Sequence, residues 1–277
     1  MGERTMWLAK IKETVEFIKG NIRSTPEIGL ILGSGLGELA EEIENAVSIP
    51  YGEIPHFHSS TVAGHKGQLI TGQLEGKQVV AMQGRFHYYE GISMQEITFP
   101  VRVLHQLGCE SLIVTNACGG MNKNFKPGDL MVIEDHINFT GSNPLIGSNI
   151  DELGPRFPDM SNAYTPELRE YAEKAAKKQN LLIQKGVYTA VSGPTYMSGA
   201  ELIMLRKLGG DVVGMSTVPE VIVARHMGMK VLGISCITDM AIGESHEGIT
   251  HEEVMEVAAT AKPRFKALIR GALKEWR

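Results

Sequence analysis

Cysteine is scarce in this chain of 277 residues, and the three that are present, Cys109, Cys118 and Cys236, stand far apart. An odd number of widely spaced cysteines forms neither a disulfide framework nor a zinc cluster, and it is typical of a reducing compartment. Long apolar runs are also lacking, since none approaches the roughly 20 residues that a helix needs to cross a bilayer. The first residues carry charge and lack the apolar stretch of a signal peptide. We therefore expect a cytoplasmic protein that does not enter a membrane.

Positive charge is not in excess, since 27 Lys and Arg stand against 32 Asp and Glu, a formal net charge of −5. A chain of this charge has no general field that attracts nucleic acid or an anionic membrane. We expect neither as a partner, and an anionic ligand must be held by local donors. No cluster of metal-ligating side chains stands out, so we also expect no metal site.

Short apolar runs alternate with helical patterns along most of the chain. Buried strands are expected at 28–32, 79–83, 112–115, 130–133, 186–191 and 231–237. Apolar residues at helical spacing predict helices at 8–18, ended by Gly20, and at 101–107, 166–178, 201–208, 218–227 and 254–270. Continuous apolar strands separated by helices are typical of an α/β fold with a largely buried sheet. No change of composition indicates a linker, so we expect a single domain over 1–277.

Serine and threonine mark several helix starts. Thr165 precedes a proline at the first helical position, and capping boxes are predicted for Ser198 with Glu201, Thr217 with Glu220, and Thr250 with Glu253. Residues 138–160 are polar and rich in Gly, Pro and Asn, which predicts a long loop. Loops of that length are usually functional or form interfaces.

A glycine-rich motif, Gly-Ser-Gly-Leu-Gly, follows the first strand at 33–37. Such glycines let backbone N–H groups approach an anion at the start of a helix, although they also serve in ordinary tight turns. The motif matches dinucleotide binding poorly, because Glu38 stands where a third glycine is required. A dehydrogenase is therefore the least favoured class.

Three further motifs have a functional and a purely structural interpretation. Residues 84–91 place Arg85 and His87 two apart, as an oxyanion clamp or as a surface arginine beside a packed histidine, and Glu90 either orients His87 or lies in a turn. Residues 115–120 are small enough for a ligand to lie on the backbone, or for close packing. Residues 214–220 bring Ser216 near a helix N-terminus. Because ligands collect at the carboxyl ends of strands in α/β sheets, the four motifs together favour anion binding.

These motifs resemble those of the trimeric class of purine nucleoside phosphorylases. The resemblance includes residues 31–37, 60–65, 82–87, 98–103, 114–117, 135–138 and 214–224, and it extends from about residue 28 to residue 257. It implies a central mixed sheet, distorted into a barrel and flanked by helices, and a homotrimer. It further implies reversible cleavage of purine nucleosides to the free base and ribose 1-phosphate, with inorganic phosphate as co-substrate and no cofactor.

The resemblance also implies roles for individual residues. Phosphate would be held by Ser34, His65, Arg85, His87, Ser216 and the backbone N–H of Ala117. Ribose would be contacted by Tyr89, Met215 and His251, and by Phe157 of a neighbouring subunit. The purine would lie against Tyr196, Met197, Val213 and Asp239. His87 and Asp239 would act in catalysis.

Two purine-selecting positions differ from family members that favour inosine and guanosine. Those members carry Glu where this chain has Met197, after a Gly-Pro-x-aromatic motif, and Asn where it has Asp239. A methionine cannot accept the N1–H of a 6-oxopurine, a loss of roughly 1–3 kcal/mol, whereas adenine has no such proton. An ionised Asp239 accepts from a 6-amino group, and a protonated one donates to N7. We therefore expect adenosine to be accepted at least as well as inosine, unless another register or loop shape leaves the choice to other groups.

Two other functions remain open. Methylthioadenosine phosphorylases also carry Asp at the position of Asp239, but they have a second Asp where this chain has Ala241, and His251 suits a 5′-hydroxyl better than a thiomethyl group. A nucleoside-binding module without catalysis has no need of a complete phosphate clamp. Phosphorolysis of purine nucleosides is the favoured prediction.

Overall fold

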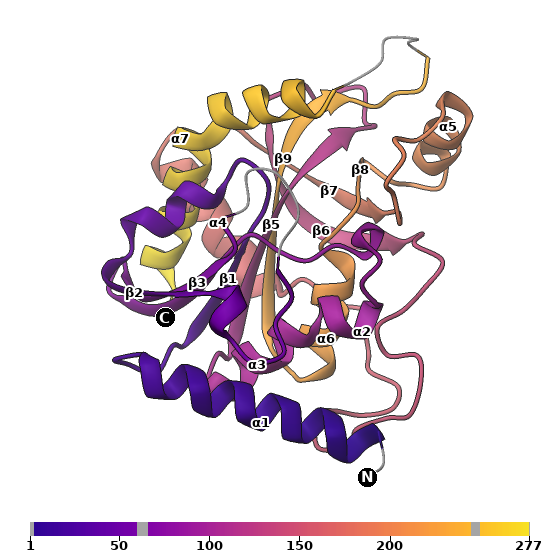
Figure 1. The fold of residues 1–277 in the computed structure, drawn as a ribbon. Coiled ribbons are helices and arrows are strands. Elements are labelled where there is room, and N and C mark those ends of the chain that lie inside the picture. Colours follow the sequence, from indigo (N-terminus) through magenta and orange to yellow (C-terminus); the bar gives the residue numbers. More distant parts are fainter. Residues whose placement is uncertain (1–2, 60–65, 245–249, 277) are drawn as a thin grey trace.

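The computed structural model describes residues 3–59, 66–244 and 250–276, in which nine strands form one sheet (Figure 1). The strands are β1 (Ile28–Leu32), β2 (Glu44–Pro50), β3 (Gln68–Leu74), β4 (Lys77–Gln83), β5 (Ser111–Gly120), β6 (Leu130–Asn138), β7 (Ile183–Ala190), β8 (Val212–Gly214) and β9 (Lys230–Met240). The α-helices are α1 (Glu3–Asn21), α2 (Met94–Ile97), α3 (Phe99–Leu107), α4 (Pro166–Lys178), α5 (Gly199–Lys207), α6 (Val218–His226) and α7 (His251–Glu275). Three short 3-10 helices are η1 (Gly37–Glu42), η2 (Tyr51–Glu53) and η3 (Tyr88–Glu90).

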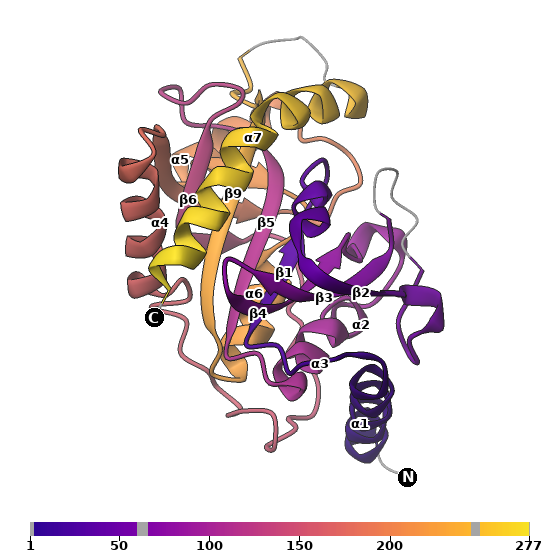
Figure 2. The same ribbon diagram turned by 90° about the vertical axis from the view of Figure 1, so that its left-hand side faces the viewer.

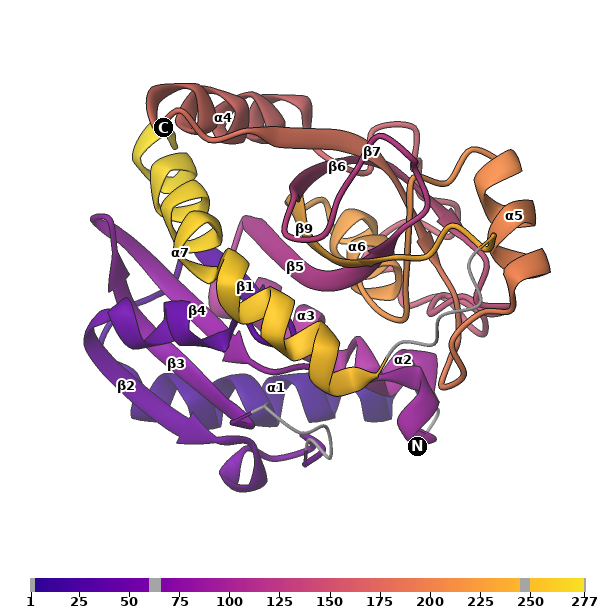
Figure 3. The ribbon, with the colours of Figure 1, turned by 90° about the horizontal axis from the view of Figure 1, so that it is seen from above.

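The sheet is mixed and closes on itself at one end. Its order is β2-β3-β4-β1-β5-β8-β7-β6-β9, and β5 also pairs with β9, so that the last five strands form a barrel. The pairs β1–β4, β1–β5 and β5–β9 are parallel, whereas β3–β4, β5–β8 and β6–β9 are antiparallel. From above, α7 runs between the barrel strands and the β2–β4 side (Figure 3). The predicted mixed sheet with a distorted barrel is confirmed.

Alternate side chains of the central strands enter two separate cores. In β1, Ile31 joins a core that includes residues of α1, α3 and α6, whereas Leu30 and Leu32 join one that includes residues of α4 and α7. A strand buried on both faces reads as a continuous apolar run, which is why these strands were recognisable from the sequence. Figure 2 shows α4 and α7 lying side by side along the barrel.

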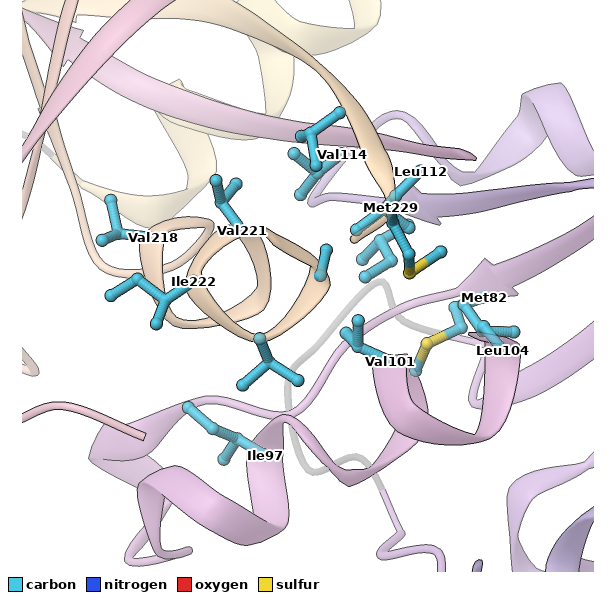
Figure 4. Packing of buried hydrophobic residues seen from close by; sticks show 14 of the residues in the cluster. Met82, Ile97, Val101, Leu104, Leu112, Val114, Val218, Val221, Ile222 and Met229 are labelled. Carbon is cyan, nitrogen blue, oxygen red and sulfur yellow. The ribbon is translucent and has the colours of Figure 1, made fainter. Parts of the chain in front are cut away.

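The helices α3 and α6 pack together against the central strands. Val101 of α3 and Val221 of α6 are fully buried, and in Figure 4 they lie near Leu112 and Val114 of β5. Burying a valine or leucine side chain stabilises a fold by roughly 1.5–3 kcal/mol. This packing therefore fixes the position of α6 against the strands.

The six predicted strands and six predicted helices are all present, but the prediction missed β2, β3, β8 and α2. β2 is an edge strand with mostly exposed side chains, and β8 has three residues, so neither carries a long apolar run. The predicted stop at Gly20 is wrong, since α1 continues to Asn21. Pro263 is exposed and α7 passes through it unbroken. Residues 139–165 form the predicted long loop, without helix or strand.

Two of the predicted capping boxes are confirmed. The hydroxyls of Ser198 and Thr250 accept from the backbone N–H groups of Glu201 and Glu253. Thr165 does not cap α4 with its side chain, because its hydroxyl accepts from the Val231 N–H at 3.0 Å. Among the helices that the structure describes, none has both the length and the apolar character needed to span a bilayer.

Candidate functional site

The glycine-rich turn after β1 lies against the carboxyl end of β5. A Cβ on Gly33 would meet the Thr115 carbonyl oxygen at 2.8 Å, and the Gly33 N–H donates to the Thr115 hydroxyl at 3.1 Å. Only glycine permits this close approach. Ser34 is half-buried in the turn, and Gly35 has a φ of +74°. The element that follows this turn is the short 3-10 helix η1.

Arg85 leaves the end of β4 and is held by groups from β5 and α6. Its Nε donates to Glu220 Oε1 at 2.8 Å, and its Nη1 donates to the Thr115 carbonyl at 2.6 Å. Nη1 also lies 3.4 Å from the Ser216 hydroxyl oxygen. Only 3% of the Arg85 side chain and 4% of that of Glu220 are exposed. The guanidinium is therefore a buried cation in a fixed position.

The segment that carries Ser216 is strained. Thr217 has φ +74° and ψ −57°, and the Val218 N–H donates to the Ser216 carbonyl at 2.8 Å, which makes a tight γ-turn. Such a conformation costs about 1–3 kcal/mol in a β-branched residue and persists only where its surroundings impose it. Here the Asn116 amide donates to the Thr217 hydroxyl at 2.9 Å, and the Ser216 hydroxyl oxygen lies 3.1 Å from the same atom.

The predicted capping box of Thr217 with Glu220 is therefore wrong. The Thr217 hydroxyl does not cap α6, because it bonds to β5 through Asn116, and the Glu220 carboxylate bonds to Arg85. Both side chains find partners more than a hundred residues away in sequence, at separations of 101 and 135 positions. A sequence signal for Glu220 did exist, since a carboxylate inside the apolar run 218–224 is buried and must be paired.

Glu90 contacts His87, as expected if it orients that residue. The Glu90 carboxylate accepts from the His87 backbone N–H at 2.7 Å and lies 3.5 Å from His87 Nδ1, in a pair with side-chain exposures of 5% and 7%. The imidazole stacks on Tyr89 with ring centroids 4.7 Å apart. Burial, and then the charge of Glu90, raises the pKa of Tyr89 to about 12, against the opposing effect of Arg85.

Tyr89 and Met215 meet at a glycine. A Cβ on Gly193, which has a φ of +65°, would lie 2.4 Å from Met215 Sδ and 3.3 Å from Tyr89 Cδ1. The backbone at Gly193 thus leaves room for both side chains. The sequence analysis quoted Gly193 within a motif but did not assign it this role.

Asp239 lies in β9, one of the barrel strands. Val213 of β8 and Asp239 of β9 both lie opposite Gly119 of β5, and a Cβ on Gly119 would be 3.1 Å from Asp239 Oδ2. The Thr238 hydroxyl lies 2.9 Å from Asp239 Oδ1 and 3.2 Å from the Cys118 carbonyl oxygen. Burial raises the pKa of Asp239, although the Thr238 hydroxyl acts in the opposite direction.

A small apolar cluster adjoins Asp239. Val213 is buried there with Val191, and Met197 and Met215 pack against it. Tyr196 is 53% exposed beside this cluster. Its pKa is raised by burial and then by the charges of Asp239 and Glu252, so both carboxylates are close to the phenol. The arrangement is an apolar cluster beside one carboxyl group.

The remaining predicted residues are placed as follows. The backbone of Ala117 lies in β5 opposite Cys236, and His251 is exposed at the first position of α7. Phe157 is 89% exposed in the long loop, with Arg156 stacked 5.8 Å from its ring centroid. His65 lies outside the described residues. Within residues 3–59, 66–244 and 250–276, no three His, Cys, Asp or Glu side chains form a group suited to a metal ion.

Comparison with known proteins gives one consistent result. The family model of the phosphorylase superfamily matches residues 27–274. Purine nucleoside phosphorylase 1 of Bacillus subtilis (strain 168) is 58% identical over 267 residues, which cover 96% of this chain and 98% of that protein. The purine nucleoside phosphorylase of Rattus norvegicus is 45% identical over 93% of this chain and 92% of its own.

Solved structures agree with these relatives. Isoform 2 of purine nucleoside phosphorylase from Schistosoma mansoni, solved with cytosine and ribose-1-phosphate, has a TM-score of 0.93 and 46% identity, with 97% of each chain covered. A Schistosoma mansoni purine nucleoside phosphorylase solved with adenosine has a TM-score of 0.93 and 40% identity, with 97% of this chain and 98% of that one covered.

Proposed function

Since the chain belongs to the phosphorylase superfamily and, within it, to the purine nucleoside phosphorylases, we propose that the group around Arg85 and Asp239 is the active site for phosphorolysis of purine (deoxy)ribonucleosides. The products are the free base and (deoxy)ribose 1-phosphate. The observation that carries this assignment is the buried Arg85 cation, held beside Ser216 and bonded to β5, the strand that also pairs with β9 at Asp239. Phosphate is a co-substrate here, and no organic cofactor or metal is part of the proposal.

Arg85 supplies the positive charge of the phosphate clamp. The hydroxyls of Ser34 and Ser216, the imidazole of His87 and the Ala117 N–H donate to phosphate oxygens, and His65 adds to them from outside the described residues. Glu220 and the γ-turn at Thr217 support the clamp because they fix Arg85 and Ser216 before the anion arrives. Preorganised donors of this kind supply much of the rate enhancement in enzymes that stabilise developing charge.

The bond that breaks joins C1′ of the sugar to N9 of the purine. As it lengthens, the sugar becomes positive and the base becomes negative. Phosphate stabilises the sugar cation and then forms the new bond at C1′, while the electron pair of the broken bond stays on the purine. Tyr89, Met215 and His251 contact the ribose in this proposal, and Phe157 of a neighbouring subunit in a homotrimer covers it.

Asp239 and Met197 favour a 6-aminopurine. Burial raises the pKa of Asp239 and so favours its neutral form, and that form donates to N7 of the leaving base in this proposal. The ionised form accepts from a 6-amino group and repels a 6-oxo group. Met197, half-buried against the apolar cluster of Val191 and Val213, offers no acceptor for the N1–H of hypoxanthine or guanine.

The test is phosphate-dependent release of base from adenosine, inosine and methylthioadenosine, measured side by side at limiting enzyme. Cleavage of adenosine at or above the inosine rate supports the role of Met197 and Asp239. A strong preference for inosine means that other groups select the base, and a preference for methylthioadenosine assigns the chain to the sister activity. If phosphate released no base from any of the three, the proposed function would be wrong.

A further inference from the structure

A cationic cavity lies away from the proposed active site. It has a volume of roughly 60 Å³ and lies between the first turn of α1, the helices α2, α3 and α6, and the loop residues 144–150. Its lining includes Arg4, Trp7, Gln95, Arg102 and His226, none of which belongs to the proposed phosphate clamp. A space of this size holds a few waters or one small ion, and is too small for a nucleoside.

Arg102 is a buried cation that has no ion-pair partner among residues 3–59, 66–244 and 250–276. It is 9% exposed, and its Nη1 is buried without a hydrogen-bond partner among the residues that the structure describes. Burial lowers its pKa to about 10. Arginine is almost never buried unless it is paired, because losing its hydration is expensive. The Nη1 group at this position is therefore suited to an acceptor that the described residues do not supply.

His226 lines the same cavity and is also buried. It is 3% exposed, and neither ring nitrogen has a hydrogen-bond partner within the described part of the chain. Its pKa is lowered first by burial and then by the charges of Arg102 and Arg156. The backbone oxygens of Gly154 and Pro155 are close enough to oppose this shift, without hydrogen-bond geometry to the ring.

The carboxylates nearby do not neutralise this charge. Glu152 pairs with Arg4 at 2.5 Å, and both side chains are 49% exposed. Arg156 donates to the carbonyls of Leu145 and Gly147 and thereby holds the loop over the cavity. The cavity thus combines a guanidinium fork and an imidazole, the donors that suit an oxyanion, with an excess of positive charge.

We propose that Arg102 and His226 form a second oxyanion site, which binds one phosphate-class anion per chain independently of the catalytic phosphate. The bound anion satisfies the free nitrogen atoms of both side chains. It also links α3 and α6 to the loop that carries Phe157. The site is assigned from these contacts alone and does not depend on the proposed reaction.

Binding of radioactive inorganic phosphate to the full chain, measured by equilibrium dialysis, tests the site. We expect two phosphates per chain in the wild type and one in Arg102→Met, which keeps the apolar stem and removes the charge. The control Arg23→Met removes an exposed arginine and should keep two. Ser216→Ala should weaken the other site, so that the two can be told apart. A wild-type chain whose bound phosphate is lost in Ser216→Ala and fully retained in Arg102→Met, or two phosphates in Arg102→Met, overturns the proposal.

Thermal unfolding and subunit assembly give a second readout. Without phosphate, Arg102→Met should melt no lower than the wild type, because it removes an unpaired buried cation, and phosphate should raise its Tm less. If instead Arg102→Met dissociates the assembly in sedimentation experiments, a carboxylate of a second copy is the counter-ion and the proposal fails. At saturating phosphate the kcat of Arg102→Met should stay within about twofold of the wild type. A wild type that cleaves no nucleoside would contradict the proposed function, whereas the phosphate whose binding requires Arg102 would still be detected.

Discussion

Replacing Glu220 by alanine should destabilise the protein by about 3–5 kcal/mol, because it leaves the Arg85 guanidinium buried without its carboxylate. The two groups are 2.8 Å apart, and their side chains are 3% and 4% exposed, so solvent cannot take over the role of the carboxylate. Neutral acceptors such as the Thr115 carbonyl remain at the guanidinium, but they do not balance its charge. Removing one partner of this buried ion pair should therefore destabilise the protein far more than removing one partner of an exposed pair.

A loss of that size corresponds to a decrease in Tm of about 6–10 °C, at roughly 2 °C per kcal/mol for a chain of this length. Calorimetry with and without inorganic phosphate measures the Tm of the wild type and of Glu220→Ala. Phosphate should reduce the difference in Tm between them, because under the proposed function it brings negative charge to Arg85. Glu220→Gln, which keeps an acceptor for Nε and loses the charge, should lie between the wild type and Glu220→Ala.

Glu167→Ala is the matched control for Glu220→Ala. Glu167 pairs with Lys230 at the same 2.8 Å and also accepts from the Tyr171 hydroxyl at 2.7 Å, but the two ion-paired side chains are 50% and 54% exposed, so its loss should cost no more than about 2 kcal/mol. If Glu220→Ala were as stable as this control, the reasoning that burial makes the Arg85 pair critical would be refuted.

Four further outcomes follow from the site. Asp239→Asn should lower the adenosine-to-inosine ratio of kcat/KM by about tenfold, as expected for one lost hydrogen bond of 1–3 kcal/mol, and an unchanged ratio would contradict the base-selection proposal. Burial raises the folded-state pKa of Asp239, so its contribution to stability is present at low pH and lost as pH rises through that pKa; urea unfolding should show the wild type losing stability relative to Asp239→Asn in this direction, and an opposite slope would refute it. Asn116→Ala should raise the KM for phosphate about fivefold, because a hydrogen bond worth about 1 kcal/mol no longer holds the strained Thr217. Steady-state kinetics at varied phosphate concentration measures this KM, and an unaltered value would contradict the role of Asn116. Phe157→Ala should raise the KM for nucleosides without lowering Tm, since the ring is 89% exposed, whereas Leu182→Ala, at 86% exposure, should change neither; equal kinetics for the two variants would argue against the shared-site trimer.

Local patterns were sufficient to predict the central architecture. The apolar runs of β1, β4, β5, β6 and β9 are visible in the sequence because both faces of each strand are buried. The motifs after these strands could be located for the same reason, and the parallel arrangement of β1, β4, β5 and β9 brings their ends together. The edge strand β2 and the three-residue β8 were not predicted, since an exposed or very short strand carries little periodic signal.

The resemblance to a family added what periodicity does not carry. Closure of the barrel depends on β5 pairing with β9 across more than a hundred residues of chain, and no local pattern in either strand encodes that partner. Knowledge of related sequences supplied this expectation, and the structure bears it out.

The sequence by itself determined the buried central strands, the longer helices and the residue types available at their ends. Only the tertiary structure decided which polar groups pair, and Thr217 with Glu220 is the clearest case. The same Thr-x-x-Glu spacing forms a capping box at Thr250, where both groups are exposed and the nearest donors are local. At Thr217 both groups are buried, and Asn116 and Arg85 arrive from other strands. A buried polar group takes the partner that the fold brings to it, because leaving either side unpaired costs more than giving up a local cap.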